Sequence, residues 1–204
     1  MISKTAGIVI IGNEVLSGKT RDTNSHFLCR ELRALGVEVR RIEVIPDEIE
    51  LIGREVAGFS GDFDWVFTTG GVGPTHDDVT MAGIAHGLGV KVVRHPVLER
   101  GLRERHGANI NEARLRMAEV PEGAELVGED SLYAVIVKFR NIYIFPGIPK
   151  ILQDRFHIIK DRFRVSPYFL KVVYLIEGEG VIASFLNNLL ADFPELLLGS
   201  YPVL

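Results

Sequence analysis

Residues 64–80 read DWVFTTGGVGPTHDDVT, and this stretch decides the fold of the chain. Residues 65–69 are all aromatic or β-branched, which is typical of a strand covered on both faces. Three glycines follow within four positions; they permit positive φ angles and let a ligand approach the backbone without meeting a Cβ atom. A helix is predicted next, with Thr75 or Asp77 as its cap. Because ligands of open α/β sheets bind at the carboxyl ends of strands, the stretch predicts a binding site as well as a turn.

Strand and helix patterns alternate on both sides of this stretch. The predicted strands are residues 6–11, 37–45, 64–69, 90–94, 134–139 and 142–145, of which the last two form a β-hairpin. The predicted helices are residues 22–35, 46–59, 78–88, 96–117 and 146–163. This alternation predicts an α/β protein with a largely parallel sheet and helices on both faces.

A smaller piece is predicted at the C-terminus. Residues 164–168 have the character of a linker, which divides the chain into a main domain of residues 1–164 and a subdomain of residues 168–204. Within the subdomain we predict a strand at 170–176, a helix at 181–190 and a strand at 196–199. Such a βαβ piece is too small to hold a core and has unpaired strand edges. It therefore packs on the main domain or on a partner chain, or it is incomplete; we expect a homo-oligomer.

The composition is that of a globular protein, with 47% hydrophobic and 25% charged residues. The net charge of −4 disfavours a general nucleic-acid-binding protein, since such proteins are usually basic. Cys29 is the single cysteine, so no disulfide can form within the chain, as fits a reducing cytoplasm. No apolar run approaches the length of a membrane-spanning helix. We therefore expect a cytoplasmic protein that binds neither nucleic acid nor membrane.

The loop after the first predicted strand looks at first like a phosphate-binding P-loop, because it ends in Gly18-Lys19-Thr20. A P-loop has four residues between its two glycines. The position that this spacing requires is Asn13, whereas Gly12 lies one residue too far away. The extra residue would misalign the N–H groups that hold the phosphates. We therefore interpret the segment as a different kind of loop.

Four motifs follow one another along the chain. They are GNEVLSG at 12–18 with DTN at 22–24, VIPDE at 44–48, TGGVGPTHDDVT at 69–80, and FPGIP at 145–149. Together they resemble the molybdopterin-binding (MoaB/Mog) domain family, in particular its branch of CinA-like proteins and FAD synthase N-terminal domains. The resemblance covers roughly residues 5–163 and implies a three-layer α/β/α fold with a mostly parallel sheet. It departs from CinA-like proteins at Asn13, where they usually have an aspartate.

The resemblance also implies a ligand and alternative functions. In the family, the glycine loop, the loop after the first strand and the Pro-Gly-Ile-Pro turn form a pocket for a pterin phosphate or a dinucleotide pyrophosphate. The CinA and FAD synthase branch is associated with divalent-metal-dependent hydrolysis of the pyrophosphate in ADP-ribose or FAD. The alternative is a non-catalytic module that binds molybdopterin in molybdenum cofactor biosynthesis. A third interpretation is a regulatory or structural domain that keeps the fold without activity.

Acidic residues stand where predicted strands end and helices begin. Hydrolysis of a pyrophosphate requires a cation and an activated water, and carboxylates suit magnesium-like ions. We predict Asp47 and Asp78 as catalytic residues and, together with Glu14, as ligands of a divalent metal, magnesium or cobalt. Alternatively, Asp47 and one of Asp77 and Asp78 are only helix caps. The predicted ligand-binding residues are Gly12, Glu14, Thr69, Gly70, Gly71, Gly73, Thr75, Asp77, Pro146 and Gly147.

The helix predicted at residues 96–117 is rich in charge. Its arginines are interpreted first as part of a solvated, salt-bridged surface. The alternative places one of them over a ligand phosphate or at a subunit interface. These arginines are Arg100, Arg103, Arg105, Arg114 and Arg116.

Overall fold

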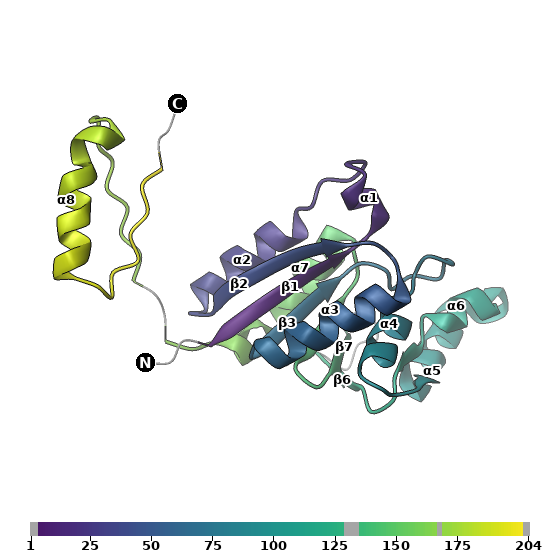
Figure 1. Cartoon of the computed structure of the whole chain (residues 1–204). Helices are drawn as coiled ribbons and strands as arrows, with labels where there is room; N and C mark the ends of the chain where they lie inside the picture. The colour runs from purple at the N-terminus through teal and green to yellow at the C-terminus, as the bar shows by residue number, and fades with distance from the viewer. Residues whose placement is uncertain (1–3, 129–134, 167–168, 202–204) are drawn as a thin grey trace. The chain divides into compact units, whose positions relative to one another are not determined.

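The computed structural model describes residues 4–128, 135–166 and 169–201. The chain divides into two compact units, Met1–Tyr168 and Phe169–Leu204, each of which is described by itself. Figure 1 shows a sheet with its helices in the first unit and a single helix in the second. The boundaries of the predicted domains, at residues 164 and 168, stay predictions.

The first unit is built on a six-stranded sheet, and the mostly parallel α/β sheet predicted from the sequence is confirmed. In spatial order its strands are β2 (Glu38–Ile45), β1 (Thr5–Ile11), β3 (Trp65–Thr69), β8 (Ile142–Phe145), β7 (Ile136–Phe139) and β6 (Glu125–Val127). The first four run parallel, β7 is antiparallel to β8, and β6 is antiparallel to β7. The predicted hairpin is β7–β8; its first predicted residue, Ala134, lies outside the described residues.

The four parallel strands end at the same edge of the sheet. Ile11 lies beside Ile45, and Thr69 lies beside both Ile10 and Phe145. The loops that follow these strands therefore leave the sheet together. This edge is the carboxyl end of the parallel strands, where ligands of open α/β sheets bind.

Helices cover both faces of the sheet, which confirms the predicted three layers (Figure 1). Successive residues of a strand point to opposite faces, so Ile8 and Phe67 pack in one core, and Val9 and Val66 in the other. The first core also contains Phe156 and Phe163, whose rings are stacked on each other. The covering helices are α2 (Asn24–Ala34) and α7 (Pro149–Ile159) on the first face, and α3 (Ile49–Asp62) and α4 (Thr80–Gly87) on the second.

Helices α3 and α4 approach each other closely because glycines line their contact. A Cβ atom on Gly87 would lie 2.0 Å from the backbone oxygen of Gly53. A Cβ atom on Gly53 would in turn lie 2.9 Å from the backbone oxygen of Gly83. Backbone atoms cannot yield as side chains do, so larger residues would force the two helices apart.

The strand predicted at residues 90–94 lies outside the main sheet. It is β4 (Val92–Arg94), which pairs with β5 (Glu119–Pro121) in a separate two-stranded antiparallel sheet. The helix predicted from residue 46 begins later, at Ile49. The three residues before it, Pro46 to Glu48, form a turn at the edge of the main sheet.

The single helix predicted over residues 96–117 is wrong. The segment is divided into α5 (Pro96–His106), a 3-10 turn at Gly107–Asn109, and α6 (Glu112–Arg116). Gly107 has a φ of 49°, and this left-handed conformation ends α5. The Asn111 side chain then accepts a hydrogen bond of 2.9 Å from the backbone N–H of Arg114, which starts α6.

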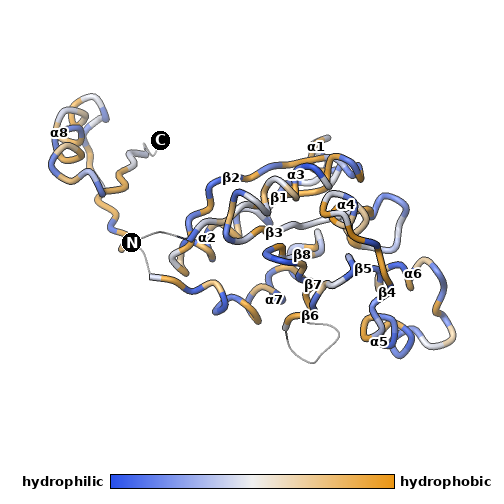
Figure 2. The backbone as a smooth tube through the Cα atoms, turned by 60° about the horizontal axis from the view of Figure 1, so that its bottom comes forward, coloured by the Kyte–Doolittle hydropathy of each residue, from blue (hydrophilic) through white to orange (hydrophobic). Residues whose placement is uncertain are grey.

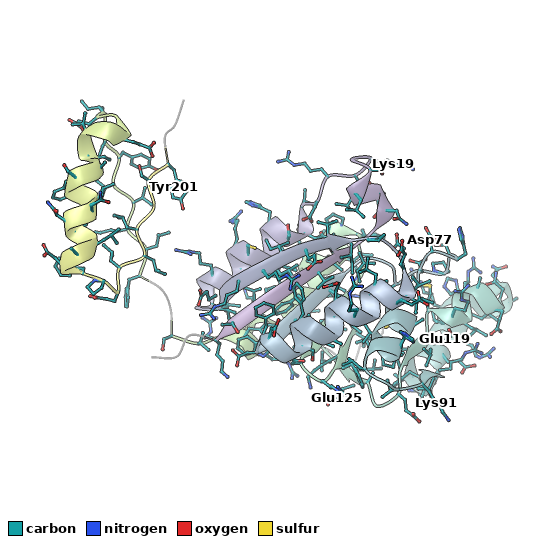
Figure 3. The ribbon with its side chains drawn as sticks, viewed as in Figure 1. Lys19, Asp77, Lys91, Glu119, Glu125 and Tyr201 are labelled. Atoms are coloured by element: carbon teal, nitrogen blue, oxygen red, sulfur yellow. The ribbon has the colours of Figure 1, made fainter. Side chains whose placement is uncertain are left out.

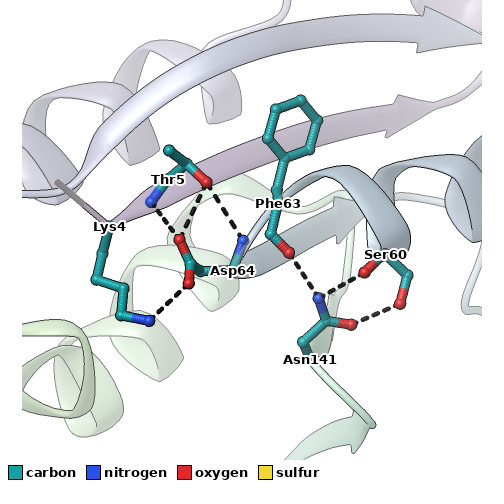
Figure 4. A network of polar contacts seen from close by, with 6 residues as sticks. All are labelled: Lys4, Thr5, Ser60, Phe63, Asp64 and Asn141. Atoms are coloured by element: carbon teal, nitrogen blue, oxygen red, sulfur yellow. Dashed lines mark hydrogen bonds and ion pairs between the residues drawn. The ribbon is translucent and has the colours of Figure 1, made fainter. Parts of the chain in front are cut away.

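Polar side chains tie the amino ends of the parallel strands together (Figure 4). Asp64 accepts hydrogen bonds from the Lys4 ammonium group at 2.6 Å and from the backbone N–H of Thr5 at 2.8 Å. Asn141 donates to the backbone oxygens of Ser60 at 3.0 Å and Phe63 at 2.8 Å. These bonds fix β1, β3, β8 and the end of α3 at the edge opposite the four loops.

In the second unit, helix α8 (Glu179–Asp192) confirms the helix predicted at 181–190. The strands predicted at 170–176 and 196–199 are wrong, because the described residues on either side of α8 form no strand. A strand needs a neighbouring backbone with which to exchange hydrogen bonds, and no such ladder forms among these residues. The apolar character that suggested strands is real: Figure 2 shows hydrophobic residues along the segments that flank the helix. Across all described residues, no helix combines the length and the apolar character needed to cross a membrane.

Candidate functional site

The loops after β1, β2, β3 and β8 meet at the carboxyl edge of the sheet and carry the predicted site residues. The first of these loops contains a short helix, α1 (Asn13–Leu16), where only a loop was expected. Lys19 and Asp77, from the loops after β1 and β3, both lie at this edge (Figure 3). The topology therefore gathers four motifs that are far apart in the sequence.

The backbone conformation and the close surroundings of the glycine loop both favour glycine at Gly70 and Gly71. Gly70 has a φ of 105°, and Gly71 has a φ of 62°, both in the region that favours glycine. A Cβ atom would lie 1.9 Å from the Ile11 oxygen at Gly70, and 2.4 Å from the Thr80 hydroxyl at Gly71. The Thr80 hydroxyl donates a 2.8 Å hydrogen bond to the Gly70 oxygen, which fixes the loop on the start of α4. These two glycines are thus needed for the fold whether or not a ligand binds.

The same loop presents three consecutive backbone N–H groups. Those of Gly71, Val72 and Gly73 donate no hydrogen bond within the residues that the structure describes, whereas the N–H of Gly70 donates to the Phe145 oxygen at 3.2 Å. All three residues line a pocket. Successive unbonded N–H groups in a turn form a concave site that attracts anions.

Asp78 closes a tight turn beside the glycines. One of its carboxylate oxygens accepts a 2.8 Å hydrogen bond from the backbone N–H of Thr75 and another from the Thr75 hydroxyl. Helix α4 begins two residues later without any side-chain cap, so the predicted capping by Thr75 or Asp77 is wrong. A Cβ atom on Gly73 would lie 2.6 Å from the Asp78 carboxylate, so a larger residue at this position would displace that carboxylate.

Asp47 connects two of the loops. Its carboxylate accepts a 2.8 Å hydrogen bond from the backbone N–H of Asn13, at the start of α1. It makes no capping bond to α3, so the interpretation of Asp47 as a helix cap is wrong. The Glu14 carboxylate folds back over Gly12, where a Cβ atom would lie 2.6 Å from its oxygen. Gly12 and Asp47 thereby position the start of α1 at the site.

Several carboxylates lie near one another at the carboxyl edge of the sheet. The pKa of Asp47 is raised above its ordinary value, first because burial disfavours the charged form and then because Glu14, Asp77 and Asp78 repel it. The hydrogen bond from the Asn13 N–H acts in the opposite direction. Four acidic groups from three loops therefore lie close enough to interact electrostatically.

Asn24, at the start of α2, connects the end of β3 to the turn after β8. Its amide nitrogen donates to the Thr69 hydroxyl at 3.0 Å and to the Gly147 oxygen at 2.8 Å. The Thr69 hydroxyl in turn donates to the Pro146 oxygen at 2.9 Å. Gly147 packs on the glycine loop, since a Cβ atom added to it would lie 3.4 Å from the Gly70 Cα.

A pocket of about 870 Å³ opens beside these loops. Seven predicted site residues line it: Glu14, Gly70, Gly71, Gly73, Asp78, Pro146 and Gly147. The other predicted residues, Gly12, Asp47, Thr69, Thr75 and Asp77, are not in the lining. Of these, Thr69 bonds to Pro146 and Thr75 bonds to Asp78, while Gly12 lies against Glu14 and Asp47 lies near Gly71. The far wall is apolar and includes Met81, Leu98, Leu102, Val137, Ile144 and Ile151.

Two arginines also line the pocket, Arg105 from α5 and Arg155 from α7. Burial lowers the pKa of Arg155, because desolvation disfavours its charged form. Arg105 belongs to the group that the sequence offered as phosphate ligands. Arg155 was missed, although it lies four residues after Ile151 and hence on the same face of its helix. Asn24 was also missed as a site residue, although it belongs to one of the quoted motifs.

The residues as arranged do not fit a metal centre. No group of three or more His, Cys, Asp or Glu side chains could hold an ion within the described ranges 4–128, 135–166 and 169–201. Asp47 and Asp78 each use a carboxylate oxygen to hold a backbone N–H, and only Asp78 and Glu14 of the predicted metal ligands line the pocket. The metal stays a prediction, and no chemical step through it is derived.

Comparison with known proteins identifies relatives over nearly the whole chain. Residues 7–164 match the profile of a family described as probable molybdopterin binding domain. A protein from Archaeoglobus fulgidus is 35% identical over 195 residues, which cover 96% of this chain and 84% of that protein. A probable FAD synthase from Caenorhabditis elegans is 36% identical over 231 residues, which cover 98% of this chain but 44% of that protein.

A solved structure supports the same assignment. The structure of the protein CinA from Thermoplasma acidophilum superposes with a TM-score of 0.72 at 27% identity, covering 79% of this chain and 100% of that one. A CinA-like protein from Fusobacterium nucleatum is 31% identical over 98% of this chain and 52% of its own length. The chain thus spans about half the length of the FAD synthase and of the CinA-like protein.

Proposed function

Because the chain belongs to the probable molybdopterin-binding domain family, we propose that it binds a pterin phosphate or a dinucleotide in the pocket beside the glycine loop. The observation that carries the proposal is the row of unbonded N–H groups at Gly71, Val72 and Gly73 on the pocket wall. Such groups hold phosphate oxygens without adding a side chain to the site.

The rest of the pocket suits the remainder of such a ligand. Arg105 and Arg155 supply positive charge, which anionic phosphates require and which an arginine delivers with directed hydrogen bonds. The apolar wall that includes Met81 and Ile144 suits a flat ring system. The pocket volume of about 870 Å³ lies within the range of small-molecule sites and leaves room for more than a single phosphate.

A second candidate function is divalent-metal-dependent hydrolysis of the pyrophosphate in FAD or ADP-ribose. The gathering of Asp47, Glu14, Asp77 and Asp78 at one edge of the sheet supports it, because a bound cation would relieve their mutual repulsion. Since these described carboxylates do not form a metal centre as they are arranged, binding of the cation would require them to move. The alternative is a non-catalytic module that binds molybdopterin in molybdenum cofactor biosynthesis, for which no hydrolysis is expected.

Binding and hydrolysis can be separated in one series of measurements. The pure protein is titrated with FAD, ADP-ribose and a pterin monophosphate, and the release of AMP from the first two is followed with and without magnesium or cobalt. Saturable binding supports the proposal, and AMP release that depends on the metal supports the second function. Failure of all three probes to saturate the protein would overturn the proposal.

The variant Arg155→Gln tests the pocket itself. Loss of a charge-assisted hydrogen bond should weaken binding of the ligand by roughly tenfold or more. Arg100→Gln on α5 serves as a matched control, since Arg100 does not line the pocket. Equal affinities of the two variants would show that Arg155 does not contact the ligand.

A further inference from the structure

We propose that Asn24 is a positioning residue that holds the turn after β8 against the glycine loop and so sets the binding geometry of the pocket. The proposal rests on the proposed function, because it concerns the same pocket. Asn24 itself is not in the pocket lining: it is 7% exposed and lies behind Thr69 and Gly147. Its influence on a ligand must therefore pass through the residues that it holds.

The hydrogen bonds around Asn24 fix which end of its amide group faces the turn. The Gly147 oxygen can only accept, so the group that faces it must be the amide nitrogen of Asn24. The Thr69 hydroxyl donates its single proton to the Pro146 oxygen and accepts from the same amide nitrogen. Both protons of the Asn24 amide are thus used.

As a result, two linked side chains satisfy the carbonyl groups of Pro146 and Gly147. Asn24 reaches the Gly147 oxygen directly and the Pro146 oxygen through Thr69. Pro146 and Gly147 both line the pocket, and Gly147 packs on Gly70. The amide of Asn24 therefore helps to hold the turn beside the glycine loop, together with the hydrogen bond from the Gly70 N–H to the Phe145 oxygen.

The oxygen of the same amide lacks a hydrogen-bond donor in the part of the chain that the structure describes. Among the described residues, Asn24 Oδ1 is buried and accepts no hydrogen bond. An unpaired buried acceptor destabilises a fold, so a side chain chosen for stability alone would not be an asparagine here. The donating half of the amide is what the position uses, which agrees with a role in holding the turn.

The variant Asn24→Asp tests the proposal with almost no change in shape. A carboxylate cannot donate to the Gly147 oxygen, and Thr69 would have to turn its proton toward the carboxylate and leave the Pro146 oxygen without a donor. The turn should then move away from the glycine loop. We expect the dissociation constant for whichever of FAD, ADP-ribose or pterin monophosphate binds the unaltered protein to rise by roughly tenfold or more.

The chain offers a matched control in Asn141→Asp. Asn141 also donates two hydrogen bonds from its amide nitrogen to backbone oxygens, at Ser60 and Phe63, but it lies at the opposite edge of the sheet (Figure 4). Both variants should melt at a lower temperature, whereas only Asn24→Asp should lose affinity. The control should bind within about twofold of the unaltered protein, because its lost bonds do not border the pocket.

Each outcome has a separate meaning. Equal affinity of Asn24→Asp and Asn141→Asp, with binding by the unaltered protein intact, would overturn the role of Asn24 and leave the proposed function standing. Absence of binding by the unaltered protein would instead overturn the proposed function. If Asn24→Asp does not fold, Asn24→Ala replaces it, since alanine removes the same two donors without burying a charge; unchanged affinity in that variant would equally refute the role.

Discussion

Neutralising Asp47 should make the protein more stable. Its carboxylate repels Glu14, Asp77 and Asp78, and burial adds to the cost of its charge, as the raised pKa shows. In Asp47→Asn the side-chain oxygen can still accept the 2.8 Å hydrogen bond from the Asn13 N–H. The only loss is the charge on that bond, so relief of repulsion should dominate.

The size of the effect follows from the exposure of the groups. Partly exposed charge pairs contribute roughly 0.2–0.5 kcal/mol each after screening by solvent and salt. Relief of the burial cost of the Asp47 charge and of the pairs with Glu14 and Asp78, less the weakening of one charge-assisted bond, leaves a net gain of about 0.5–1 kcal/mol in the free energy of unfolding. In a chain of this length, that gain raises the melting temperature by roughly 1–4 °C.

The gain should depend on pH in a defined direction. A carboxyl with a raised pKa in the folded state holds its proton longer there than in the unfolded chain, so stability falls as the pH rises through its ordinary value of 3.8 and then through the raised value. Calorimetry at pH 7 should therefore show Asp47→Asn above the unaltered protein, and at pH values below both pKa values the difference should vanish. A lower melting temperature for Asp47→Asn at pH 7, or a gain that persists in acid, would refute the reasoning.

Two further substitutions test the packing and the opposite edge of the sheet. Gly87→Ala on α4 should lower the free energy of unfolding by about 1–3 kcal/mol, because its Cβ would overlap the Gly53 oxygen. Gly58→Ala on α3 meets open space and should not destabilise, and urea unfolding of both variants compares them. Asp64→Asn should cost roughly 0.5 kcal/mol at pH 7, because the hydrogen bond from Lys4 lowers the pKa of this partly exposed carboxyl. That stability is present above pH 3.8 and lost as the pH falls through the lowered value, so thermal melts of the two proteins should converge in acid; parallel curves down to pH 2 would contradict this.

Local patterns were sufficient to predict the layers of the fold. The aromatic and β-branched run before Gly70 is β3, and the apolar spacing around Leu28 and Leu32 is the buried face of α2. The family resemblance predicted that the glycine loop and the Pro146–Pro149 turn line one pocket, as they do in the structure. These features depend on residues that are near one another in the sequence or on whole motifs.

Pairings between distant residues could not be predicted in the same way. The alternative interpretation of Asp47 as a helix cap rested on its place just before a helix, but its hydrogen-bond partner is the N–H of Asn13, 34 residues earlier. The bond from Asn24 to Gly147 spans 123 residues. The strands predicted in the apolar segments beside α8 were wrong for a related reason. A strand needs a neighbouring strand as well as a suitable composition, and the sequence showed only the composition.

The contact between Gly53 and Gly87 gives the two acidic loops a common support. Helix α3 begins just after Asp47, and α4 begins just after Asp78. At Gly53 and Gly87 the two helices meet backbone to backbone. Two helices in such close contact have little room to move independently of each other. We therefore expect a ligand that displaces the start of α4 to shift the start of α3 as well, and with it Asp47 and its hydrogen bond to the start of α1.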